Sequence, residues 1–161
     1  MAKFLRGFEC AWQSVRPVPR VEIDFGNGTK LTRTLNGNIA TLFCTSDGGV
    51  YDIVPGLVAA DEFLRRAREA VALHGFTGST RTLAAYHRVK IDADGDAEAG
   101  ATLLDEDTRI NIETRYPMAH ALMARRPLAR PEEITSELYR DILDVDLDDP
   151  FLGLKPHFDG A

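Results

Sequence analysis

The sequence predicts an α+β fold in which a four-stranded antiparallel meander over residues 20–54 is covered by helices. Up to Val54, short runs rich in β-branched and aromatic residues alternate with turns that contain glycine, a pattern typical of hairpins. After Gly56 the apolar residues recur at the three- and four-residue spacing of an amphipathic helix. With 161 residues, 44% of them hydrophobic, the chain can bury one core. We therefore expect a single domain over residues 1–161.

The first hairpin follows a lead-in over residues 1–19. Residues 21–25 alternate apolar and polar side chains, and a glycine-rich turn leads into the second strand. A three-residue loop through Gly28 sets Ile23 against Leu31, whereas a two-residue loop would set Ile23 against Thr32. The three-residue loop buries more apolar surface, so we predict that register.

The second hairpin joins strands at residues 39–45 and 50–54. With Asp47-Gly48 as a two-residue loop, Leu42 faces Ile53 and Cys44 faces Tyr51. A tight turn at residues 36–38 would pair the two hairpins and complete the meander. Both faces of the third strand are apolar, so we expect it to be covered on both sides.

A helix over residues 58–74 completes the part of the domain formed by residues 20–74. Its spacing predicts a core-facing side that includes Phe63 and Val71, and a solvated side that includes Arg66. The helical part follows over residues 79–145. Ser79 is its first expected N-cap, later helices are expected at about 104–114, from Pro117 and from Pro131, and residues 146–161 are expected to form a docked tail.

Residues 37–74 resemble the second half (β-β-α) of thioredoxin-like domains. The resemblance rests on a strand, a glycine turn, a second strand ending near Gly56 and a closing helix that begins with Phe63-Leu64. It implies the alternative fold, a thioredoxin-like α/β domain with a mixed sheet. The chain lacks the Cys-x-x-Cys motif of that family and has no proline near residues 39–41. The resemblance then implies a platform that binds a partner.

The net charge of −6 argues against a nucleic-acid or anionic-membrane partner, because phosphate binding depends on clustered cations. No stretch is apolar for long enough to span a bilayer, and the N-terminus lacks the apolar centre of a secretory signal. Two cysteines are too few for a disulfide scaffold. We expect a soluble cytoplasmic protein, and the sequence does not define its oligomeric state.

Two groups of residues are candidates for chemistry. Cys10 lies near two arginines in the sequence and could act as a reactive thiol, with Cys44 as a resolving partner. Asp144, Asp146 and Asp148 alternate with apolar residues and could line one side of an extended segment as metal ligands.

The four histidines show no HxxxH or HExxH spacing, and no phosphate loop or GxSxG motif is present. We therefore expect no cofactor. We expect a small binding or protein-interaction module without a catalytic set, whose partner is another protein. The alternative is a thiol-dependent redox protein of thioredoxin-like type that uses Cys10, so whether the chain is an enzyme stays open.

Overall fold

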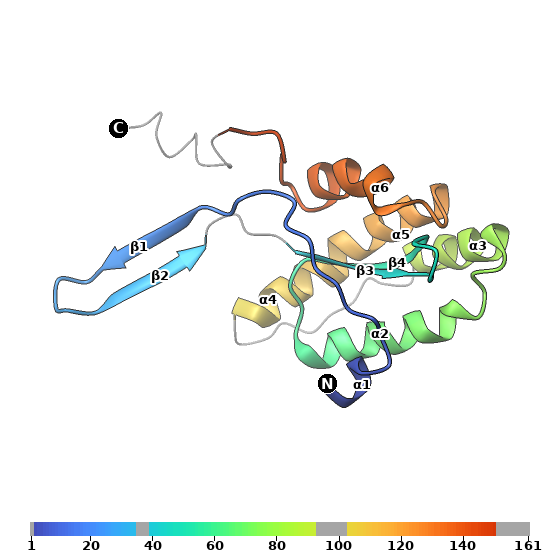
Figure 1. Cartoon of the computed structure of the whole chain (residues 1–161), viewed down its shortest axis with the longest axis horizontal. Helices are drawn as coiled ribbons and strands as arrows, with labels where there is room; N and C mark the ends of the chain where they lie inside the picture. The colour runs from blue at the N-terminus through green and yellow to red at the C-terminus, as the bar shows by residue number, and fades with distance from the viewer. Residues whose placement is uncertain (1, 35–38, 93–102, 151–161) are drawn as a thin grey trace.

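The computed structural model describes residues 2–34, 39–92 and 103–150, and within them the chain is α+β, as predicted. Two antiparallel sheets of two strands each are present, and helices enclose the second sheet (Figure 1). The expected tail at 146–161 lies outside the described residues from 151 onward. The elements are α1 (Ala2–Leu5), β1 (Arg20–Asp24), β2 (Lys30–Thr34), β3 (Ala40–Cys44), β4 (Val50–Pro55), α2 (Ala60–His74), α3 (Thr80–Ile91), α4 (Leu103–Ile110), η1 (Asn111–Arg115), α5 (Tyr116–Arg125), α6 (Pro131–Glu137) and η2 (Leu138–Ile142).

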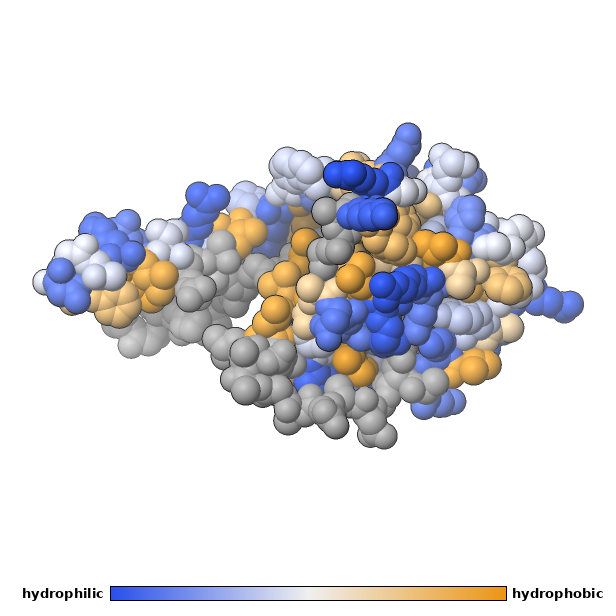
Figure 2. Space-filling model, turned by 90° about the horizontal axis from the view of Figure 1, so that it is seen from below, coloured by the Kyte–Doolittle hydropathy of each residue, from blue (hydrophilic) through white to orange (hydrophobic). Residues whose placement is uncertain are grey.

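The β1-β2 hairpin has the predicted register and projects from the body as an arm (Figure 1). Ile23 pairs with Leu31, and Gly28 has the positive φ of +85° that a three-residue loop requires. Lys30 forms an ion pair with Glu22 at 2.6 Å on the polar face. Hydrophobic surface lies beside hydrophilic surface at the free end of the arm (Figure 2).

The predicted four-stranded meander is not observed as one sheet. Within the described residues β1 pairs with β2 and β3 pairs with β4, and no ladder joins the two hairpins. Neither sheet is mixed, because both pairings are antiparallel. The prediction relied on the tendency of consecutive strands to pair. Here the second hairpin is stabilised by helices instead, since all of β4 is buried.

The β3-β4 register agrees with the prediction at Leu42 and departs from it at Cys44. Leu42 pairs with Ile53, as expected, but Cys44 pairs with Val50 instead of Tyr51. The loop closes through Thr45 N–H to Gly49 O at 2.9 Å, so it is one residue longer than predicted. A β-bulge at Tyr51 absorbs this difference.

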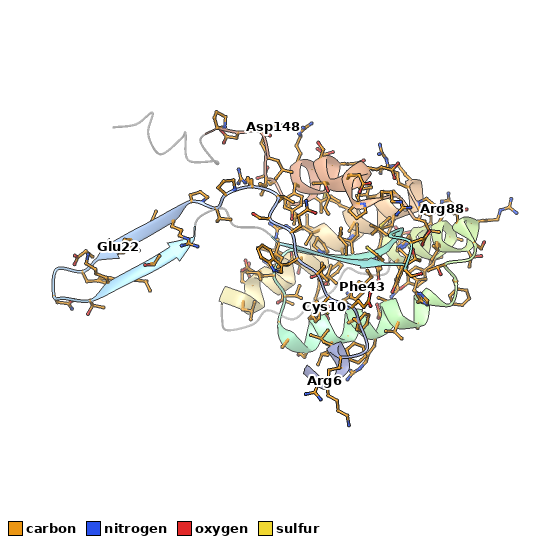
Figure 3. The ribbon with its side chains drawn as sticks, viewed as in Figure 1. Arg6, Cys10, Glu22, Phe43, Arg88 and Asp148 are labelled. Carbon is orange, nitrogen blue, oxygen red and sulfur yellow. The ribbon has the colours of Figure 1, made fainter. Side chains whose placement is uncertain are left out.

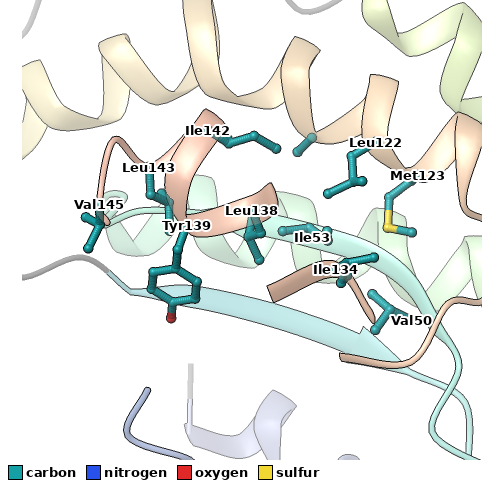
Figure 4. Close-up of a cluster of buried hydrophobic side chains, with 11 residues drawn as sticks. Val50, Ile53, Leu122, Met123, Ile134, Leu138, Tyr139, Ile142, Leu143 and Val145 are labelled. Atoms are coloured by element: carbon teal, nitrogen blue, oxygen red, sulfur yellow. The ribbon is translucent and has the colours of Figure 1, made fainter. Parts of the chain in front are cut away.

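Both faces of the β3-β4 sheet are covered, as its apolar strands predicted. On one side Val50 and Ile53 pack against α5, α6 and η2 (Figure 4). On the other side Tyr51 and Val54 pack with residues of α2, α3 and α5. The lead-in also reaches this second cluster, because the Phe8 ring lies 6.0 Å from the Phe43 ring, centroid to centroid.

Helix α2 is rotated relative to the prediction. Arg66, expected in solvent, is 3% exposed, and Val71, expected in the core, is 49% exposed. Burial of the Arg66 guanidinium is possible because it lies over the Tyr116 ring at 3.7 Å and its Nε donates to Glu62 at 2.9 Å. The buried stripe of α2 is therefore Arg66, Ala67, Ala70 and Leu73.

The later helices begin close to where their capping residues predict. Ser79 caps α3 by accepting the N–H of Thr82 at 3.2 Å, and Pro131 opens α6. The separate helix predicted from Pro117 is not observed, because residues 103–125 form one continuous helical segment in which the π-helical turn η1 lies between α4 and α5. None of the described helices is both long and apolar enough to cross a membrane.

Candidate metal centre

Three buried polar side chains converge from three elements. Asp52 comes from β4, His87 from α3 and His120 from α5, and they are 5%, 1% and 2% exposed. One potential ligand atom from each residue lies within 4.8 Å of the other two. Among the described residues, this is the one group of at least three His, Cys, Asp or Glu side chains with such spacing.

Local structure explains why these residues point toward one another. Strand residues alternate faces, and Ile53 and Val54 belong to opposite clusters. Asp52 therefore shares the side of Val54, and the bulge brings Tyr51 to that side as well. His87 lies one turn after the buried Leu83 on α3.

The π-helical turn η1 directly precedes α5, the helix that carries His120. Tyr116 and His120 are four residues apart on α5 and are both buried, so they share its inner face. Single π-helical turns inside helices occur frequently at functional sites. The position of η1, directly before Tyr116, agrees with that tendency.

His87 is held in one orientation by hydrogen bonds at both ring nitrogens. Its Nε2 lies 2.9 Å from Tyr51 O and its Nδ1 lies 2.9 Å from Nδ1 of His120. A carbonyl oxygen only accepts, so Nε2 carries the proton and Nδ1 presents its lone pair. Burial, together with the neighbouring His120, lowers the pKa of His87 to about 4, although the bond to Tyr51 O opposes this change. At neutral pH the imidazole is therefore uncharged.

Asp52 is a buried carboxyl group whose charge is only partly compensated. Burial raises its pKa to about 6, while His120, the N–H of Ile53 and Arg66 favour the ionised form. The Ile53 N–H donates to Asp52 Oδ1 at 2.9 Å. Glu69 disfavours ionisation through its charge. Above pH 6 the cluster thus holds a carboxylate that a cation would stabilise.

Tyr116 adds a hydroxyl group without a protein partner. The residue is fully buried, and among the described residues its hydroxyl oxygen has no hydrogen-bond partner. Burial raises the pKa of Tyr116 although the charge of Arg66 opposes this change, so the hydroxyl stays protonated. A buried hydroxyl that lacks a partner loses free energy unless a ligand or ordered water binds it.

The Tyr86 ring packs against the rings of the two histidines. Its ring centroid lies 5.2 Å from that of His87 and 6.4 Å from that of His120, in edge-on geometry. Tyr86 is itself half-buried. Tyr86 thus contacts the buried cluster and is also partly accessible to solvent.

The predicted thiols lie apart from this cluster. Cys10 and Cys44 are both exposed and both free, so no disulfide joins them. Cys10 lies on the lead-in (Figure 3), where its Sγ is 3.9 Å from Phe8 O. Burial of the sulfur raises the pKa of Cys44, which disfavours the thiolate. A catalytic role for the two cysteines, and the thioredoxin-like resemblance, stay predictions.

The predicted aspartate ligands are exposed on the segment after η2. Asp146 Oδ1 accepts the N–H of Asp148 at 3.0 Å, and Asp146 O accepts from Arg16 at 2.9 Å. Asp144, Asp146 and Asp148 do not form a ligand group of the kind found at Asp52 within the described part of the chain. Metal binding by these three residues stays a prediction.

Sequence reasoning missed the Asp52, His87 and His120 cluster because no two of its members are close in sequence. The sequence does contain a weaker indication of the cluster, because each of the three residues is a polar residue within an apolar segment. Asp52 stands within Val50–Val54, His87 follows Leu83 on a buried stripe, and His120 lies in the run from Met118 to Met123. A polar residue in such a position needs a buried partner, but the sequence does not say which partner it has.

The opposite pKa shifts of Asp52 and His87 predict a specific pH dependence for the metal-free protein. The lowered pKa of His87 gives stability that is present above about pH 6.5 and is lost as the pH falls toward 4. The raised pKa of Asp52 acts in the other direction, because the folded state gains stability by binding a proton below pH 6. The two effects largely cancel between pH 7 and pH 5.

Asp52→Asn removes one of these two effects. We expect the variant to lose about 1 kcal/mol more unfolding free energy than the wild type between pH 7 and pH 5. Urea unfolding at both pH values, in the presence of a chelator, measures this difference. Parallel pH profiles for the two proteins would contradict the assignment of Asp52.

Comparison of the chain with protein-family models, with curated proteins and with solved structures finds no match. The class of this protein is therefore described by its fold and its site alone. The chain is an α+β protein in which helices enclose a two-stranded sheet. A buried cluster of one aspartate and two histidines lies between that sheet and helices α3 and α5.

Proposed function

We propose that this protein binds a divalent transition-metal ion through Asp52, His87 and His120. The observation that carries the proposal is the convergence of three buried ligand atoms, each within 4.8 Å of the others. Two imidazole nitrogens and one carboxylate oxygen suit zinc, iron, cobalt or nickel. Calcium and magnesium prefer sites made only of oxygen ligands.

The hydrogen bond between the histidines supports this ligand set. The two Nδ1 atoms are 2.9 Å apart, and two nitrogens bound tetrahedrally to zinc at about 2.0–2.1 Å would be roughly 3.3–3.4 Å apart. The two rings would therefore need to move apart by about half an ångström to bind the ion together. The ion would replace the proton shared by the rings, so binding would release a proton.

The surroundings of His87 also match those of a metal ligand. A metal-bound histidine usually donates its second ring N–H to a carbonyl or a carboxylate, which fixes the ring. The His87 Nε2–H bond to Tyr51 O at 2.9 Å provides this contact and leaves Nδ1 directed toward His120. The neutral state of His87 at pH 7 is the state that binds metal.

Three protein ligands leave one tetrahedral position for water or another small ligand. This composition is typical of catalytic zinc sites, whereas structural zinc sites generally have four protein ligands. Tyr116 lies one turn before His120 on the buried face of α5, and its hydroxyl, without a partner among the described residues, is available as a hydrogen-bond donor. The metal would thus be able to exchange a ligand inside an apolar enclosure.

Direct titration tests the proposal. Chelator-treated protein is titrated with Zn²⁺ by calorimetry and with Co²⁺ by visible absorption, and we expect one ion per chain with tetrahedral Co²⁺ bands. Asp52→Asn and His120→Leu should each weaken binding by about 100-fold or more, since each removes a direct ligand. His74→Ala is the matched control, because His74 is exposed and lies outside the cluster.

Two results would refute metal binding at this site. The first is the absence of saturable heat and of Co²⁺ bands in wild-type protein that is folded by circular dichroism. The second is an equal loss of binding in His74→Ala and His120→Leu. Either result would leave the cluster as a buried hydrogen-bond network.

A further inference from the structure

An apolar groove adjoins the proposed metal centre. It has a volume of about 370 Å³ and lies between the C-terminal end of α2 and one face of α3. Phe76 and Val89, which line it, are 54% and 72% exposed, a large exposure for such side chains. The groove is lined by Leu73, Phe76, Thr82, Ala85, Tyr86 and Val89.

Tyr86 belongs to both the groove and the cluster. Its ring lines the groove and makes edge-on contacts with His87 and His120 at 5.2 and 6.4 Å between centroids. A molecule in the groove would therefore contact the same ring that contacts both histidines. A change in the position of this ring would therefore alter both the groove and the proposed metal centre.

The size of the groove favours a small molecule over a macromolecule. Its volume lies in the range of small-ligand pockets, about 300–1,000 Å³. A stable protein interface uses roughly 20–30 residues on each side, and this groove is lined by six.

The polarity of the groove favours an uncharged ligand. Thr82 Oγ1 already donates to Ser79 Oγ at 2.9 Å. Lys90, whose Nζ lies 5.8 Å from the Tyr86 ring centroid, is paired with Glu69 at 3.6 Å. The remaining lining side chains are apolar or aromatic, apart from the Tyr86 hydroxyl.

We infer that this groove binds a small, uncharged, apolar molecule and that Tyr86 couples its occupancy to the metal centre. The binding of the molecule follows from the groove alone, whereas the coupling rests on the proposed metal function. Because coupling between two sites is reciprocal, the metal and the apolar molecule would change each other's affinity by the same factor.

The test uses 4-fluorotoluene, which is apolar and has no metal-binding group, as the probe and ¹⁹F NMR as the readout. We expect saturable binding to the wild type, with an affinity that differs by about fivefold or more between Zn²⁺-loaded and metal-free protein. Loading with Co²⁺ should broaden the resonance of the bound probe through paramagnetic relaxation. Tyr86→Leu should reduce the difference between the two metal states.

A pair of neighbouring substitutions locates the binding site. Val89→Gln should weaken probe binding by about tenfold, because it replaces the most exposed large apolar side chain of the groove. Arg88→Gln is the control. Arg88 is exposed on the same helix and does not line the groove (Figure 3). Neither substitution touches a proposed metal ligand, so the Co²⁺ spectrum should stay unchanged in both.

The outcomes separate the two proposals. If the Co²⁺ bands are normal but the probe does not bind, the groove is not a binding site, while the metal function stands. The same conclusion follows if the probe binds equally well to the wild type and to Val89→Gln. Probe binding that is identical in the metal-free and Zn²⁺-loaded states would overturn the coupling through Tyr86. Absent Co²⁺ bands would overturn the metal function and the coupling, and the ¹⁹F titration of metal-free protein would still decide whether the groove binds the probe.

Discussion

Replacing Gly56 by alanine is expected to lower the free energy of unfolding by about 3–4 kcal/mol. Gly56 follows β4 with φ +79°, and a Cβ atom there would lie 2.6 Å from Asn111 Oδ1 and 2.9 Å from Arg115 Nη1. The left-handed conformation alone costs a non-glycine residue about 1–2 kcal/mol.

The remainder of the effect comes from the buried amide of Asn111. Asn111 is fully buried, its Nδ2 donates to Leu57 O and its Oδ1 accepts from Arg115 at 2.9 Å. A methyl group at position 56 would displace this amide, and buried polar groups that lose their hydrogen bonds cost about 1–3 kcal/mol. Urea unfolding followed by circular dichroism measures the total.

Gly48→Ala is the matched control for this prediction. Gly48 also has a positive φ, +89°, but its added Cβ would meet the end of the exposed Arg130 side chain at 2.6 Å. That side chain can move away, so we expect little more than the backbone cost of about 1–2 kcal/mol. Equal destabilisation by the two substitutions would show that the contact with Asn111 contributes nothing.

Saturation with Zn²⁺ is expected to raise the free energy of unfolding by about 4 kcal/mol at a free concentration 1,000 times the dissociation constant. The proposed ligands come from β4, α3 and α5, and the unfolded chain does not hold them together. The ion therefore binds the folded state preferentially, and the stabilisation follows from mass action. Urea unfolding with buffered Zn²⁺ measures it.

The variants that test binding also test this stabilisation. At the same zinc concentration His120→Leu, whose affinity is expected to be about 100-fold weaker, should gain only about 1.4 kcal/mol or less, while His74→Ala should gain as much as the wild type. Stabilisation of both variants to the same extent would mean that zinc acts elsewhere on the protein. Comparison within each variant, with and without zinc, removes the effect of the substitution itself.

Local features of the fold followed from short stretches of sequence. The pairing of Ile23 with Leu31 depends on one glycine loop and on the alternation of a few side chains. The cap at Ser79 depends on the N–H of Thr82 three residues later. The residues that form these interactions are close in the sequence, so both partners can be recognised within one short stretch.

Other features of the fold depend on tertiary contacts that local sequence patterns do not predict. The rotation of α2 depends on Tyr116, which lies 50 residues after the Arg66 that stacks on it. The bulge at Tyr51 depends on a loop one residue longer than its turn sequence indicated. Apolar spacing alone does not include these contacts, so it predicted that Val71 lies in the core and that Arg66 lies in solvent.

The sequence by itself determined the α+β class, the two hairpins and the approximate starts of the helices, because backbone preference and side-chain spacing act over a few residues. Only the tertiary structure decided that the hairpins form separate sheets and that Asp52, His87 and His120 meet. Those three residues are brought together by packing of α3 and α5 around β4. Packing between distant elements depends on the shape and burial of many side chains at once, which local pattern does not encode.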